Sequence, residues 1–184
     1  ARLDQVQGLL ERMLAEGCRS RIQPAPPPLP GRVRNLLFVG SGNSARSLMA
    51  EAILRDMAGS RFEAFSAGVD AGGAPHGPAM AMLRELGHDT GALWSKPAAP
   101  FMAADAPRMD MVVTLCDRAA NADLPAWPGQ PVQVHWGLPD PAGAGTPEAL
   151  AETYLTLRAR LDRLTRLPPA LPRAAVQQAL DDLA

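Results

Sequence analysis

Residues 38–51 contain most of the side chains in this chain that could do chemistry. An apolar run over Asn35–Val39 predicts a strand, and an apolar-periodic helix is expected over Ser44–Met57. A short connection of small residues joins the two and leads to Arg46 and Ser47. Such a loop at a helix N-terminus points its backbone N–H groups inward, which predicts a site for a tetrahedral oxyanion such as phosphate or arsenate.

The residues of this loop each have a physical role in such a site. The planar guanidinium of Arg46 is a fork of donors that can hold two oxygens of one anion. The competing interpretation is a surface arginine, but the helix dipole disfavours a cation there unless it holds an anion. Gly42 is expected to allow a positive φ or a close backbone approach, and Asn43 to brace the loop. The expected oxyanion-binding residues are Gly40, Ser41, Gly42, Asn43, Ser44, Ala45, Arg46 and Ser47.

The loop sequence Gly-Ser-Gly-Asn-Ser-Ala-Arg-Ser resembles the C-x5-R-S loop of low-molecular-weight protein tyrosine phosphatases. It is most similar to the thiol-dependent arsenate reductase branch, whose loop typically reads C-T-G-N-S-A-R-S. Further segments keep the family's order: Ser66–Gly68, Trp94–Lys96, Val113–Asp117, Trp127–Pro131 and His135–Pro141. The resemblance implies a three-layer α/β sandwich with a four-stranded parallel sheet and a ligand site at the carboxyl ends of its strands.

The chain departs from this family at the reacting residue. The family's nucleophilic cysteine falls at Gly40, which offers no side chain for attack. By the same resemblance, Asp140 matches the general acid that protonates the leaving oxygen, and the competing interpretation is a turn aspartate. Ser47 matches the donor to the thiolate, whereas Ser41 is interpreted as a small loop residue rather than a hydroxyl nucleophile.

The arsenate reductases of this family also use two further cysteines, which pass a disulfide to thioredoxin or a similar reductant. Cys116 matches the first of them. The second would lie just before Trp127, where the chain has Leu124 and no cysteine. Cys116 is therefore expected to be a semi-buried structural thiol, and a thioredoxin-type reductant is a partner only if the chain is active. Cys18 lies outside the matched region and is given no catalytic role.

The composition narrows the class of protein. A net charge of −1 and 47% hydrophobic residues favour one globular domain and indicate neither a nucleic acid nor a membrane as partner. No apolar run approaches the ~18 residues of a transmembrane helix, and no signal peptide is visible. Two cysteines are too few for a disulfide framework, which predicts a reducing, cytoplasmic location. The three histidines stand apart, so neither a metal nor a cofactor is expected.

Three regions are expected along the chain. The spacing of apolar residues predicts an amphipathic helical extension over residues 1–23. This helix either folds onto its own domain, forms a homodimer or is the remnant of a fused domain. Residues 24–32 form a proline-rich linker, and residues 33–184 the phosphatase-like domain. The further elements expected in that domain are strands at Phe62–Ser66, Met111–Leu115 and Val132–His135, and helices at His76–Leu86, from Pro147 after an N-cap at Thr146, and at Leu171–Leu183.

Three functional hypotheses follow. The favoured one is a catalytically silent relative that binds phosphate or arsenate, as a sensor or accessory of arsenic resistance. The second is an interaction scaffold whose pocket is vestigial and whose N-terminal helix makes the contacts. The third is an arsenate reductase or phosphatase whose nucleophile was removed by engineering, although serine or alanine is the usual replacement and the second shuttle cysteine is absent as well.

Overall fold

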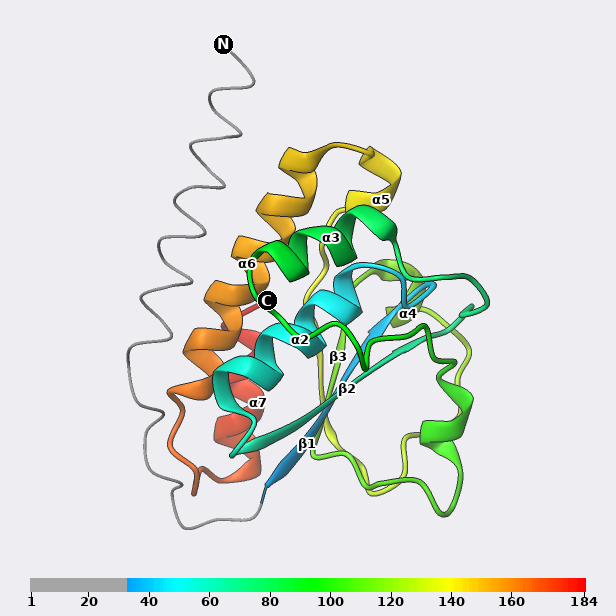
Figure 1. Cartoon of the computed structure of the whole chain (residues 1–184). Coiled ribbons are helices and arrows are strands. Elements are labelled where there is room, and N and C mark those ends of the chain that lie inside the picture. Colours follow the sequence, from blue (N-terminus) through cyan, green and yellow to red (C-terminus); the bar gives the residue numbers. More distant parts are fainter. Residues whose placement is uncertain (1–32) are drawn as a thin grey trace.

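The structure is a computed structural model, and it describes residues 33–184. The extension and the linker expected before residue 33 lie outside the described residues. The described chain forms a four-stranded parallel sheet in the order β2-β1-β3-β4 (Figure 1). Its strands are β1 (Arg34–Gly40), β2 (Phe62–Gly68), β3 (Met111–Thr114) and β4 (Val132–His135). The parallel α/β sheet expected from the sequence is confirmed.

Helices cover one face of the sheet, and loops with short helical segments cover the other (Figure 1). The longer helices are α2 (Arg46–Ala58), α3 (Gly77–Glu85), α6 (Pro147–Thr165) and α7 (Arg173–Asp181). Three short segments were not expected from the sequence, because each is only four residues long: η1 (Ala99–Met102), α4 (Asp117–Ala120) and α5 (Pro141–Ala144).

The two faces of the sheet have separate apolar cores. Along β1, Leu36 and Phe38 point into the core beneath the longer helices, whereas Leu37 and Val39 point into the smaller core on the other face. All four side chains are fully buried. A strand buried on both faces reads as a continuous apolar run, as expected for the centre of a parallel sheet.

The ends of the elements differ slightly from the predictions. The Thr146 hydroxyl accepts a hydrogen bond from the backbone of Ala149 at 3.3 Å, so the expected N-cap is confirmed. Gly87 has a φ of 85° just after α3, which confirms its expected role in ending that helix. Helix α2 begins at Arg46 rather than at Ser44, because the intervening residues belong to the loop. The other observed bounds lie within two residues of those expected.

A hydrogen-bond chain links α6 to α2. The hydroxyl of Tyr154, whose side chain is buried, lies 2.8 Å from Nε2 of His88. The other ring nitrogen of His88 contacts the carboxylate of Asp56 on α2. Burial raises the pKa of Tyr154 above its ordinary value, because the phenolate would lie among apolar groups.

Across residues 33–184, no helix has both the length and the apolar character needed to cross a membrane.

Candidate functional site

The 40–47 loop lies at the carboxyl end of β1, the strand that pairs with β2 on one side and β3 on the other. Two backbone N–H groups in the segment after β2 donate hydrogen bonds to carbonyls of this loop. Asp70 donates to the carbonyl of Ser41 at 2.9 Å, and His76 donates to the carbonyl of Ser44 at 2.8 Å. The loop is therefore tied at two points to chain that is distant in sequence, and its backbone shape is preformed.

Asn43 is the centre of a buried hydrogen-bond network inside the loop. Its side-chain amide donates to the hydroxyl oxygens of Ser47 and Ser66, both at 2.9 Å. Its side-chain oxygen accepts the backbone N–H of Lys96 at 2.7 Å. The Ser95 hydroxyl donates to the backbone carbonyl of Asn43 at 2.8 Å. The loop, β2 and the segment 95–96 are thus joined through one side chain, in agreement with the bracing expected of Asn43.

The positive φ in the loop falls on Asn43, at 50°, and not on Gly42 as the sequence suggested. Asparagine tolerates this left-handed conformation better than most residues. A Cβ added at Gly42 would meet only the Ser44 hydroxyl, at 3.9 Å, so close approach does not require glycine there either. The close approach lies at Gly68, where a Cβ would come within 2.7 Å of the backbone of Asn43 and of Ser41. The end of β2 therefore packs directly under the loop.

A buried carboxylate supports the loop from α2, and the sequence analysis overlooked it. Glu51 is 3% exposed, and its Oε2 accepts from Lys96 Nζ at 2.9 Å and from the Ser66 hydroxyl. Its Oε1 contacts Arg55. Only the structure reveals its role, because its place in the buried run 47–54 leaves a charge that needs partners.

Arg46 and Asp140 meet although they are far apart in the sequence. Arg46 Nη1 donates to the carbonyl of Leu138 at 2.8 Å, and Nη2 lies 3.4 Å from the Asp140 carboxylate. The Arg46 side chain is 10% exposed, whereas that of Asp140 is 55% exposed. Asp140 also accepts from the backbone of Gly143 at 3.2 Å and so caps α5. Arg46 is thus a fixed side chain rather than a surface arginine.

The backbone at Gly40 is compatible with a larger residue. The φ of Gly40 is not positive, unlike those of Gly87, Gly129 and Gly145. A Cβ added to Gly40 would lie 3.1 Å from the Ser47 hydroxyl oxygen and 3.7 Å from the Ser47 Cβ. Ser47 itself is buried, and its oxygen accepts from Asn43. The space beside Gly40 is therefore bounded by one hydroxyl.

Cys116 lies apart from this network. It is a buried free thiol at the start of α4, in the smaller core with Trp127. The half-buried Leu124 packs against the same cluster. Leu124, which stands in the stretch expected to hold a second redox cysteine, therefore lies against the core that contains Cys116.

Two of the three histidines within residues 33–184, His88 and His135, make side-chain hydrogen bonds. His135 at the end of β4 lies 2.9 Å from the Thr114 hydroxyl and 3.1 Å from the Asp117 carboxylate. Within residues 33–184, no three His, Cys, Asp or Glu side chains gather in a way that could hold a metal ion.

Comparison with known proteins points to one family. The model of the low molecular weight phosphotyrosine protein phosphatase family matches residues 35–178. The arsenate reductase of Brevibacillus brevis is 36% identical over 116 residues, which cover 62% of this chain and 82% of that protein. The arsenate reductase of Halalkalibacterium halodurans is 39% identical over 114 residues, which cover 61% of this chain and 78% of that protein. A solved arsenate reductase in its phosphate-binding state has a TM-score of 0.61 and 30% identity, covering 72% of this chain and 96% of that one.

Proposed function

Because the chain belongs to the low molecular weight phosphotyrosine protein phosphatase family, we propose that it binds phosphate or arsenate on its 40–47 loop without turning the anion over. The observation that carries this proposal is the low exposure and fixed orientation of the Arg46 side chain. Its guanidinium is nearly buried and is oriented by the Leu138 carbonyl and the Asp140 carboxylate. A preoriented guanidinium at the start of a helix favours a dianion that can be held by two oxygens.

The braced loop supports the same proposal. Asn43 holds the backbone from inside, so the loop amides do not need to be ordered when the ligand arrives. A site that is formed in advance loses less entropy on binding. The missing thiolate helps as well, because a negative sulfur at position 40 would repel a dianion.

Turnover requires groups that this chain does not have at the matched positions. Gly40 supplies no nucleophile, so neither a phosphocysteine nor an arsenocysteine forms there. Leu124 supplies no thiol to carry a disulfide outward from Cys116. A thioredoxin-type reductant is therefore a partner only if the chain is active. The role that remains is oxyanion binding, as a sensor or accessory protein of arsenic resistance.

Calorimetric titration of the full chain with phosphate, arsenate and sulfate tests the binding. The Arg46→Ala variant should bind about 10- to 100-fold more weakly, since a charge-assisted hydrogen bond of about 1.5–3 kcal/mol is lost. Arg84→Ala is the matched control, because it removes the same charge from an exposed position on α3 that contacts Thr90. Binding that is equal in both variants, or absent at millimolar anion, would favour the scaffold hypothesis instead.

Two assays test the absence of turnover. Purified protein is incubated with p-nitrophenyl phosphate, and separately with arsenate, thioredoxin, thioredoxin reductase and NADPH. Neither rate should exceed the uncatalysed background. Turnover that disappears in the Arg46→Ala variant would contradict the proposal, because it would show that the loop reacts without a cysteine at position 40.

A further inference from the structure

The backbone of the 40–47 loop uses its acceptors within the protein and leaves its donors unused. Its carbonyls at positions 40, 41 and 44 accept backbone N–H groups from the segment 69–76 at 2.8–3.1 Å. Within residues 33–184, none of the backbone N–H groups of residues 41–45 donates to a protein acceptor. The loop backbone therefore offers donors to a ligand, as expected of an anion site.

The side chains at the end of the loop add further donors. The Ser47 oxygen accepts from Asn43, and the Ser47 hydroxyl hydrogen has no acceptor among the described residues. A guanidinium has five N–H donors. Arg46 directs one of them to the Leu138 carbonyl, and its Nη2 lies beside Asp140. The remaining donors of Arg46 are available to an anion.

Asp140 differs from every one of these groups, because it brings a carboxylate to a site made of donors. Its Oδ2 accepts the backbone N–H of Gly143 at 3.2 Å, and its Oδ1 lies 3.4 Å from Arg46 Nη2. A Cβ added at Gly143 would lie 2.9 Å from Asp140 Oδ2, so glycine leaves room for this cap. Pro139 and Pro141 flank Asp140 and restrict its backbone. The carboxylate is therefore held beside the guanidinium.

An anion bound to Arg46 shares that guanidinium with a second negative group. Because one side chain holds both, an oxygen of the anion lies close to the Asp140 carboxylate. Two bare oxygen acceptors repel each other at such a place. An oxygen that carries a proton instead donates a hydrogen bond to the carboxylate, and hydrogen bonds with one charged partner are the strong ones.

We infer that Asp140 makes the 40–47 loop selective for oxyanions that carry a proton. Hydrogen phosphate and hydrogen arsenate have such a proton, whereas sulfate has none near neutral pH. The inference rests on the proposed oxyanion binding and adds the protonation state of the ligand to it. The role differs from that of a general acid, because the proton belongs to the bound anion and no bond is broken.

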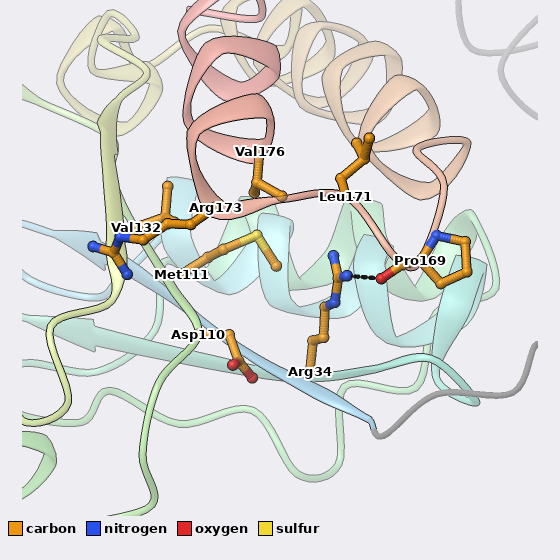
Figure 2. Close-up of a pocket in the computed structure, with 8 residues that line it drawn as sticks. All are labelled: Arg34, Asp110, Met111, Val132, Pro169, Leu171, Arg173 and Val176. Carbon is orange, nitrogen blue, oxygen red and sulfur yellow. Dashed lines mark hydrogen bonds between the residues drawn. The ribbon is translucent and has the colours of Figure 1, made fainter.

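The cavity at the other end of the sheet does not take the same anions. It has a volume of about 360 Å³ and lies at the amino ends of the strands (Figure 2). Its aliphatic lining belongs to the core, because Met111, Val132 and Val176 are buried. Figure 2 shows Arg34 and Arg173 at opposite ends of this cavity, so the two guanidiniums do not converge on one anion. This cavity therefore does not compete with the loop for a small oxyanion.

Three tetrahedral dianions test the selection on the full chain. Phosphate, sulfate and monofluorophosphate are titrated by calorimetry in a mildly alkaline buffer of constant ionic strength, where phosphate is mostly the dianion. In monofluorophosphate, fluorine replaces the hydroxyl group, so the ion keeps phosphorus and the charge but has no proton. Sulfate and monofluorophosphate should each bind about 10- to 100-fold more weakly than phosphate, the loss of one charge-assisted hydrogen bond.

One variant and one matched control assign the selection to Asp140. Asp140→Asn keeps an oxygen for the Gly143 N–H, removes the charge and adds an amide donor. Its affinity for sulfate and for monofluorophosphate should rise until all three anions bind within about threefold of one another. Asp89→Asn removes the same charge from an exposed aspartate whose Oδ1 accepts the Gly91 N–H at 2.8 Å. This control should keep the preference of the parent chain for phosphate.

The outcomes separate this inference from the proposed function. Equal binding of phosphate and sulfate by the parent chain, lost in Arg46→Ala, would reject the selection and leave oxyanion binding intact. Monofluorophosphate that binds as tightly as phosphate would reject it as well, since the proton would then be irrelevant. An unchanged preference in Asp140→Asn would assign the selection to another group. If none of the anions binds, the proposed function and this inference both fail.

Discussion

Replacing Gly40 by cysteine tests whether one residue separates this chain from a working phosphatase site. A Cβ at this position meets the Ser47 hydroxyl at 3.1 Å, and the next atom within 4 Å is the Ser47 Cβ at 3.7 Å. Removing a glycine restricts the unfolded chain and stabilises the fold by about 0.4–1 kcal/mol, which the tight contact offsets in part. We expect the free energy of unfolding of Gly40→Cys to stay within about 1 kcal/mol of the parent chain, measured by urea denaturation.

The new thiol should also become reactive. A helix N-terminus and a neighbouring guanidinium lower the pKa of a thiol, and α2 with Arg46 supplies both. The thiolate would attack the phosphorus of an aryl phosphate while Asp140 protonates the leaving oxygen. Gly40→Cys should therefore hydrolyse p-nitrophenyl phosphate measurably. Adding Asp140→Asn should reduce that rate by about 10²- to 10⁴-fold, the usual effect of a general acid.

A Gly40→Cys protein that folds and binds phosphate but stays inert would refute this reasoning. It would mean that Arg46 and Asp140, although correctly paired, no longer meet the reacting atoms. Sustained arsenate reduction by thioredoxin should not return with this change alone. It should require Leu124→Cys as well, because position 124 lies against the core that holds Cys116, and a thiol there could accept the disulfide from Cys116 and pass it to thioredoxin.

Three further predictions concern the support of the site and the core. Gly68→Ala should lower the free energy of unfolding by more than about 2 kcal/mol and weaken phosphate binding, because its Cβ would lie 2.7 Å from loop backbone. Gly72→Ala, whose Cβ would meet nothing within 4 Å, should be neutral in the same denaturation assay. Lys96→Met should cost about 3 kcal/mol by leaving the buried Glu51 with one cation fewer, and adding Glu51→Gln should recover most of the loss. Tyr154 is the single tyrosine of the chain, so native tyrosinate absorbance should titrate above pH 10.0; its raised pKa gives stability that is full below that pH and is lost as the pH rises through the folded value.

Much of the architecture could be predicted from the sequence, because its signals are local. The apolar run before Gly40 can be buried on both faces only in a central strand, and the run at 111–115 reads the same way. The N-cap at Thr146 and the glycine at 87 mark helix ends through their own backbone preferences. The absence of a nucleophile at position 40 is likewise a property of the sequence alone.

The support of the site was decided by tertiary structure. Nothing local in the sequence indicates that Gly68 lies under the loop, since the close approach depends on the register of β1 against β2. The pairing of Arg46 with Asp140 joins residues 94 positions apart and arises only when the chain after β4 returns to the start of α2. Glu51 looks like an ordinary helical glutamate until folding removes it from water and surrounds it with cations. The sequence therefore determines which residues are present at the site, whereas distance, burial and charge compensation follow from packing of segments that are remote along the chain.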